Sequence, residues 1–101
     1  MVSSGPVYSG PYTFSGNNKT ITEDFYVTAS KLTVEYSASG IGDFPDIYTL
    51  TVWLYDENRR YVDAVVGLEG SGTFNFRTNG AGFYYLEVVP LYAGWTFTVS
   101  Q

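Results

Sequence analysis

The chain lacks the side chains that most enzymes use for acid–base, nucleophilic and metal chemistry. It contains no histidine and no cysteine. A serine hydroxyl therefore has no imidazole base beside it, no thiolate is present, and zinc and redox metals have no ligand set. The carboxylates fall in expected turns or on strand surfaces, where nothing indicates the raised pKa of a glycosidase acid. We therefore expect a protein that is not an enzyme, with no catalytic residues.

Positive charge is also scarce. Only 15% of the residues are charged, the formal net charge is −5, and the five Lys and Arg residues are scattered apart from the pair Arg59–Arg60. Nucleic acid and anionic membrane surfaces both require a basic cluster, so neither is an expected partner. No apolar run approaches the roughly 20 residues that cross a bilayer, so we expect no membrane insertion.

Strand-forming residues are abundant instead. Aromatic residues make up 19% of the chain, with ten Tyr, seven Phe and two Trp. Thr, Val, Ser and Gly are frequent and strong helix formers are sparse. Branched and aromatic side chains fit a pleated, half-buried surface. One hundred and one residues are enough for one domain with its own core. The composition predicts an all-β protein without substantial helix.

Short alternating runs separated by turn residues predict about eight strands. Such spacing is typical of an antiparallel two-sheet β-sandwich, here expected to resemble a jelly roll. The expected strands cover residues 20–27, 31–38, 48–55, 60–67, 73–78, 83–90 and 94–101, with a short edge strand at 12–15. The alternation predicts an inward-facing set of Phe25, Val27, Leu32, Val34, Tyr36, Phe74, Phe76, Tyr84, Leu86, Val88, Trp95, Phe97 and Val99.

A hairpin is expected where 48–55 meets 60–67 across the polar turn at 56–59. In the returning strand, Val62, Ala64 and Val66 would share one face. Tyr61, Asp63 and Val65 would share the other. Residues 39–46 are expected to form a loop.

Residues 1–15 are expected to be a linker-like lead-in or an edge strand, and residues 16–101 a single sandwich domain. The first ten residues, MVSSGPVYSG, have neither the charged start nor the apolar core of a signal peptide. Their Ser, Gly and Pro content is typical of a linker. This favours a module from a longer secreted chain and an extracellular or cell-surface location.

The order of several short motifs resembles that of the bacterial and archaeal pre-peptidase C-terminal domain. The motifs are Leu54-Tyr55-Asp56, then GFYYLEV at 82–88, then WTFTV at 95–99, with DFYV at 24–27 as a further match. The resemblance implies a non-catalytic, jelly-roll-like accessory module attached to exported enzymes. Some relatives of that family bind collagen or polysaccharide, and some bind calcium.

One strand carries aromatic residues on the face that should point to solvent. In 48-YTLTVWLYDE-57, Tyr48, Leu50, Val52 and Leu54 alternate with Thr49, Thr51, Trp53 and Tyr55. Flat rings flanked by hydroxyls suit sugars, and Tyr and Trp also suit extended peptides. We expect a ligand-binding surface at Trp53 and Tyr55. Thr49, Thr51 and Tyr61 would lie beside them, and Tyr26 and Tyr85 point outward on their own strands.

Three other interpretations of this face stay open. The N-terminal segment 1–15 could lie across Trp53, with Tyr8, Pro11 and Tyr12 as the contacts. Tyr and Thr could be present simply because they are good strand residues. The face could also contact another domain or another copy of the chain.

Calcium is the one candidate ion. Asp43 and Asp46, in 43-DFPDIY-48, could supply part of an oxygen shell. Asp side chains also close turns without any metal. The spacing of this pair differs from the Asp-x-Asp of many pre-peptidase domains. No other cofactor is expected.

These features together predict a non-catalytic extracellular module that binds a polymer, a carbohydrate before a protein. The alternative is a structural or adhesive subunit of a cell surface or filament that self-associates or packs on a neighbouring domain. Self-association would use the open edges of the sandwich.

Overall fold

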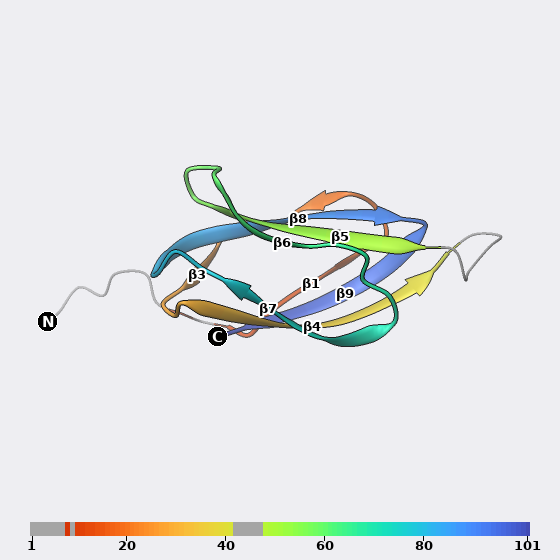
Figure 1. Ribbon diagram of the computed structural model, residues 1–101, viewed down its shortest axis with the longest axis horizontal. Coiled ribbons are helices and arrows are strands. Elements are labelled where there is room, and N and C mark those ends of the chain that lie inside the picture. The colour runs from red at the N-terminus through yellow and green to blue at the C-terminus, as the bar shows by residue number, and fades with distance from the viewer. Residues whose placement is uncertain (1–7, 9, 42–47) are drawn as a thin grey trace, which may run out of the picture.

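Two antiparallel sheets pack face to face and form a β-sandwich (Figure 1). The computed structural model describes residue 8 and residues 10–41 and 48–101. In the four-stranded sheet, the order is β1 (Tyr12–Gly16), β9 (Ala93–Ser100), β4 (Lys31–Gly40) and β7 (Ser71–Arg77). In the five-stranded sheet, it is β2 (Thr20–Ile21), β8 (Gly82–Leu91), β5 (Thr49–Asp56) and β6 (Tyr61–Val65), with β3 (Phe25–Val27) also paired to β8. The predicted all-β sandwich is confirmed.

The strand order is that of a jelly roll. If β2 and β3 are counted as one strand, the eight strands form two interlocked Greek keys, and successive strands lie in opposite sheets except in the β5–β6 hairpin. No helix occurs in the described ranges, so none of these residues forms a helix long and apolar enough to cross a membrane.

The core lies between the sheets and follows the predicted alternation. The largest fully buried side chains are Phe76, Phe97, Leu32, Leu50, Leu54, Leu86, Val27, Val34, Val52, Val88 and Val99. Trp95 and Tyr84 are also buried, while Tyr36 and Phe74 pack against the core from its margin. All thirteen residues of the predicted inward set therefore lie in or against the core.

The predicted strand at 20–27 is interrupted at Thr22. The Thr22 amide donates to the Leu86 carbonyl, and its Oγ1 accepts from the Leu86 amide, both at 2.9 Å. Because the side-chain oxygen takes the place of a backbone acceptor, the regular ladder stops here. The break divides one expected strand into β2 and β3, which explains nine strands instead of about eight.

The predicted faces of the returning hairpin strand are wrong from Asp63 onward, because Asp63 pairs with the inward-facing Leu54. Val65 pairs with Val52, so it points toward the core, while Ala64 pairs with Trp53 and points outward. Val66 is exposed. The cause is a bulge between Leu54 and Tyr55 in the β5–β6 register, which inserts an unpaired residue and shifts every later side chain to the other face.

The predicted edge strand at the N-terminus is confirmed and is part of the sandwich. β1 pairs with β9 from Tyr12 opposite Val99 to Gly16 opposite Trp95. β4 is longer than predicted, because pairing with β9 continues to Gly40 opposite Ala93. The expected loop therefore begins after Gly40.

Candidate binding face of the five-stranded sheet

All seven residues predicted to bind a ligand lie on the outer face of the five-stranded sheet. The strand register shows this directly, because directly paired residues point to the same side. Tyr55 pairs with Tyr85 on β8 and with Tyr61 on β6. Tyr26 on β3 pairs with Phe83, and Thr49 and Thr51 precede Trp53 on β5. Below, the aromatic face means Tyr26, Trp53, Tyr55, Tyr61, Phe83 and Tyr85.

Several rings on this face contact one another, within a strand or between neighbouring strands. Trp53 and Tyr55 have centroids 6.3 Å apart with planes tilted by 46°. Tyr55 stacks on Tyr85 at 5.3 Å and 18°. Tyr26 and Phe83 meet edge to face at 5.1 Å. Offset and edge-to-face pairs of this kind stabilise the arrangement beyond the area they bury.

The β5–β6 turn places a cation over the centre of the aromatic face. Asp56 Oδ1 accepts from the Asn58 and Arg60 amides at 2.8 and 3.0 Å, which closes the turn. Arg59 then adopts a left-handed backbone with φ of 63°. Its guanidinium carbon lies 5.6 Å from the centre of the Tyr85 ring, a cation–π contact. The left-handed residue thus directs its side chain back over the sheet.

Glu87 supplies the polar centre of the face. Its pair on β5 is Trp53, and its Oε2 lies 3.4 Å from Lys19 Nζ. Burial raises the pKa of Tyr55 above its ordinary value of 10.0. The negative charge of Glu87 and the hydrogen bond between the two side chains raise that pKa further. Both causes favour the protonated phenol of Tyr55 beside the Glu87 carboxylate.

The predicted residues differ in how accessible they are. Trp53 is 40% exposed and Tyr61 is 62% exposed. Tyr26, Tyr55, Thr49 and Thr51 are half-buried. Tyr85, although it faces outward, is only 8% exposed because Tyr55 and Arg59 cover its ring. A ligand would therefore contact Trp53 and Tyr61 most fully, with Tyr85 as support beneath.

The described N-terminal residues do not cover Trp53, so that interpretation is wrong for residues 8 and 10–15. Tyr12 belongs to the other sheet and packs against the core, where its ring lies 5.3 Å from that of Phe25 on β3. The Tyr8 ring packs on Tyr12 at 5.5 Å. Both rings thus extend the core at one end of the sandwich.

Sequence reasoning missed several neighbours on this face. Ile21, Val89 and Leu91 are exposed aliphatic side chains, and Ile21 pairs with Glu87. Phe83, Glu87 and Val89 were signalled by the alternation that places Leu86 and Val88 inward. The position of Arg59 has no such signal, because it depends on the conformation of one turn.

The predicted calcium ligands Asp43 and Asp46 lie outside the described residues. Within residues 8, 10–41 and 48–101, no three His, Cys, Asp or Glu side chains come together as a metal site. The chain matches neither a model of a known protein family nor any curated protein.

Proposed function

We propose that this protein is a non-catalytic extracellular module that binds a carbohydrate polymer through the aromatic face. One observation carries the proposal. The two sheets each have an outer face made of good strand residues, yet only the five-stranded sheet carries aromatic rings there. Good strand propensity alone does not explain this, because Thr and Ser suffice on the opposite sheet.

The chemistry of the face suits sugar rings. Trp53 offers a flat surface for the C–H face of a sugar, and Glu87 and Lys19 lie beside it with charged groups for hydroxyls. Thr49 and Thr51 continue along the same strand with hydroxyls of their own. Because the Trp53 and Tyr55 planes are tilted by 46°, a chain that contacts both must twist between them.

The jelly-roll topology is compatible with this function without establishing it. Lectin domains use the same architecture, but so do proteins of unrelated function. The resemblance to the pre-peptidase C-terminal domain supports the same proposal through its short motifs at 54–56, 82–88 and 95–99. That family also supports an accessory role beside an exported enzyme.

A second function, that of a structural or adhesive subunit, is favoured by one specific observation. Ile21, Val89 and Leu91 are exposed on the same outer face as Trp53. Contiguous apolar surface of this kind is also found at protein–protein contacts. In this case the face would pack on a neighbouring domain or on a second copy.

Binding to a panel of soluble polysaccharides, measured by affinity electrophoresis, tests the proposal. We expect retardation by at least one polymer, and its loss in Trp53→Ala and Tyr61→Ala. Tyr92→Asn is the matched control, because it removes an exposed ring at the β8–β9 turn while Asn tolerates the positive φ found there. Retardation by no polymer, together with concentration-dependent assembly in light scattering, would favour the structural subunit instead.

A further inference from the structure

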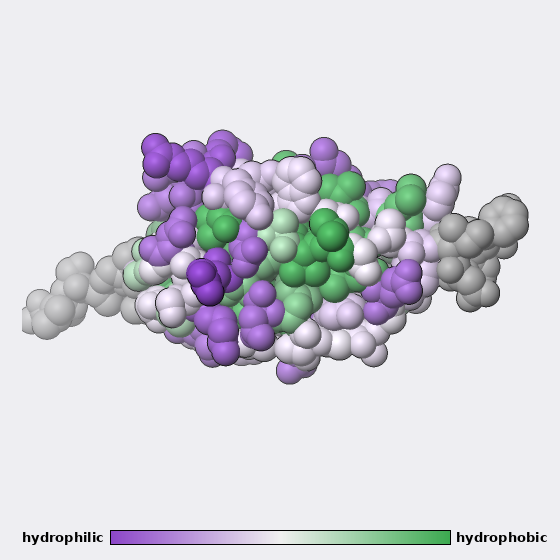
Figure 2. Space-filling view, in the orientation of Figure 1, coloured by the Kyte–Doolittle hydropathy of each residue, from purple (hydrophilic) through white to green (hydrophobic). Residues whose placement is uncertain are grey.

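A polar groove lies on a different part of the molecule, at the open edge between β6 and β7. Figure 1 views the sandwich from this side, where β6 and β7 are the edge strands of their sheets. The groove has a volume of about 710 Å³ and is lined by Ser30, Lys31, Val62, Asp63, Asn75, Phe76 and Arg77. That volume falls within the range of about 300–1,000 Å³ typical of ligand sites. Figure 2 shows this side with hydrophobic side chains at its centre and hydrophilic ones to the left.

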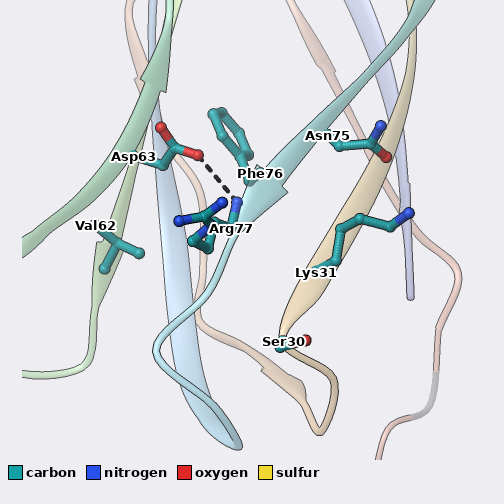
Figure 3. Close-up of a pocket in the computed structure, with 7 residues that line it drawn as sticks. All are labelled: Ser30, Lys31, Val62, Asp63, Asn75, Phe76 and Arg77. Atoms are coloured by element: carbon teal, nitrogen blue, oxygen red, sulfur yellow. Dashed lines mark hydrogen bonds between the residues drawn. The ribbon is translucent and has the colours of Figure 1, made fainter.

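Two cationic side chains line the groove from adjacent strands. Lys31 on β4 and Arg77 on β7 are direct cross-strand partners, and like charges in that position are unfavourable. Both side chains are exposed, and in the described part of the chain neither forms an ion pair. In Figure 3 the Arg77 guanidinium extends toward β6 and the Lys31 ammonium extends away on the other side of β7. Two of five cations in an acidic protein thus lie on adjacent strands without a carboxylate partner.

On the β6 side, the groove carries a carboxylate that is already held by backbone amides. Asp63 Oδ2 accepts from the Arg77 amide and Oδ1 from the Ala64 amide, both at 2.9 Å (Figure 3). Its position is therefore set, and each carboxylate oxygen keeps the capacity to accept a further hydrogen bond. A simple anion such as sulfate would be repelled by Asp63, whereas a hydroxyl would donate to it.

Hydrogen bonds hold together the strand ends that carry the groove residues. Thr78 Oγ1 donates to the Ala29 carbonyl at 2.6 Å and the Thr78 amide donates to the Ser30 carbonyl at 2.9 Å. Thr33 Oγ1 donates to Asn75 Oδ1 at 3.0 Å. These bonds join the end of β7 to the start of β4, so Lys31 and Arg77 project from backbone that is already ordered.

The hydrogen bond from the Arg77 amide to Asp63 argues against an extended peptide as the ligand. A peptide added as a strand to β7 would need the Arg77 amide as a donor, but Asp63 occupies it. An inward-pointing charge of this kind protects a sheet edge from pairing. A sugar chain needs no backbone ladder and uses side-chain donors and acceptors instead.

We propose that the groove between β6 and β7 binds an acidic polysaccharide, one built from uronic acid units. Arg77 would bind a carboxylate inside the groove, and Lys31 would bind a further carboxylate where the chain passes over β7. Asp63 and Asn75 would accept from or donate to the ring hydroxyls. A uronic acid unit has a carboxylate for the cations and hydroxyls for Asp63 and Asn75. This site is separate from the aromatic face and does not depend on it.

Isothermal titration calorimetry with trigalacturonate and with galactotriose, its carboxyl-reduced counterpart, tests the proposal. We expect saturable binding of trigalacturonate that weakens as salt is added, and at least tenfold weaker binding of galactotriose. Inorganic sulfate and a glutamate-rich peptide should both bind more weakly than trigalacturonate. Equal binding of the neutral sugar, or tighter binding of sulfate or of the peptide, would overturn the proposal.

Matched variants locate the binding. Arg77→Gln and Lys31→Gln should each weaken trigalacturonate binding at least fivefold, because charge-assisted hydrogen bonds to carboxylate are lost. Arg77→Gln leaves the Asp63 bond intact, since that bond uses the backbone amide. Arg60→Gln makes the same charge change in the exposed β5–β6 turn and should have no effect. Trp53→Ala should also have none, and a loss there would assign the acidic sugar to the aromatic face.

Discussion

The outer faces of the two sheets differ in composition although both belong to one small sandwich. The outer face of the four-stranded sheet, called the polar face below, carries Thr13, Ser15, Lys31, Thr33, Glu35, Ser37, Thr73, Asn75, Arg77, Thr96, Thr98 and Ser100. The aromatic face carries six rings, with exposed aliphatic side chains beside them. Between the sheets, in contrast, lies one continuous cluster of buried apolar side chains.

The difference between the two outer faces shows that outward-facing rings are not a requirement of the fold. The four-stranded sheet carries hydroxyl and charged side chains on its outer surface, so the architecture does not require rings there. We therefore propose that the rings on the five-stranded sheet have a role beyond strand formation, with the partly exposed Trp53 and Tyr61 as the residues open to a ligand.

The largest effect that would test this comparison concerns stability. Tyr85→Ala removes an outward ring that is nevertheless buried beneath Tyr55 and Arg59. We expect it to lower the free energy of unfolding by about 2–4 kcal/mol, near the cost of core truncations. Thr98→Ala, in the middle strand β9 of the polar face, should change it by less than about 0.5 kcal/mol. Urea denaturation measures both.

A matched variant separates the ring from the hydroxyl. Tyr85→Phe keeps the stacked ring and should retain most of the stability lost in Tyr85→Ala. If Tyr85→Ala and Thr98→Ala cost the same, the outer faces would be energetically equivalent and the comparison would fail.

A smaller effect concerns the alkaline stability of the aromatic face. The folded-state pKa of Tyr55 is raised, so the folded protein holds this proton more tightly than the unfolded chain does. The resulting stabilisation is fully present below the unfolded value near 10 and is lost as pH rises through the folded value. Between about pH 9 and 11, the wild type should therefore lose more stability than Tyr55→Phe.

Titration of tyrosinate absorbance provides the companion measurement. Glu87→Gln should lower the pKa of Tyr55, because it removes the negative charge beside the phenol. Burial is the larger cause and persists, so the pKa should stay above 10.0 in that variant. A Tyr55 pKa unchanged by Glu87→Gln would mean that the two side chains do not interact in solution.

The smallest effect concerns the polar face. Lys31→Gln removes one of two like charges placed directly opposite each other. We expect thermal unfolding to show unchanged stability or a gain of about 0.2–0.5 kcal/mol, in line with cross-strand pair energies. A clear loss would indicate that Lys31 stabilises the fold, which would weaken its assignment to ligand binding.

The alternation of side chains was sufficient to predict the sandwich, the core and the outward position of the seven residues proposed to bind a ligand. It worked because both inner faces are continuous, so each strand has an unambiguous phase. It failed at Asp63, Ala64 and Val65, where a bulge shifts the phase, and at Thr22, where a side chain replaces a backbone acceptor. Such features depend on local hydrogen bonds that hydrophobic periodicity does not encode.

The groove at β6 and β7 could not be predicted either. It is built from the ends of strands far apart in the sequence, and Lys31 and Arg77 meet only through the β4–β7 register. The role of Arg59 was likewise hidden, because its place over Tyr85 depends on a left-handed residue in a tight turn.

Tryptophan fluorescence during titration with soluble polysaccharides tests the central claim most directly. The two tryptophans differ in environment, since Trp53 is partly exposed on the aromatic face and Trp95 is buried in the core. We predict a saturable change for at least one polymer that disappears in Trp53→Ala, while Trp95 emission stays that of a folded protein. A flat response across the panel, or an unchanged response in Trp53→Ala, would contradict the assignment of the aromatic face to carbohydrate binding.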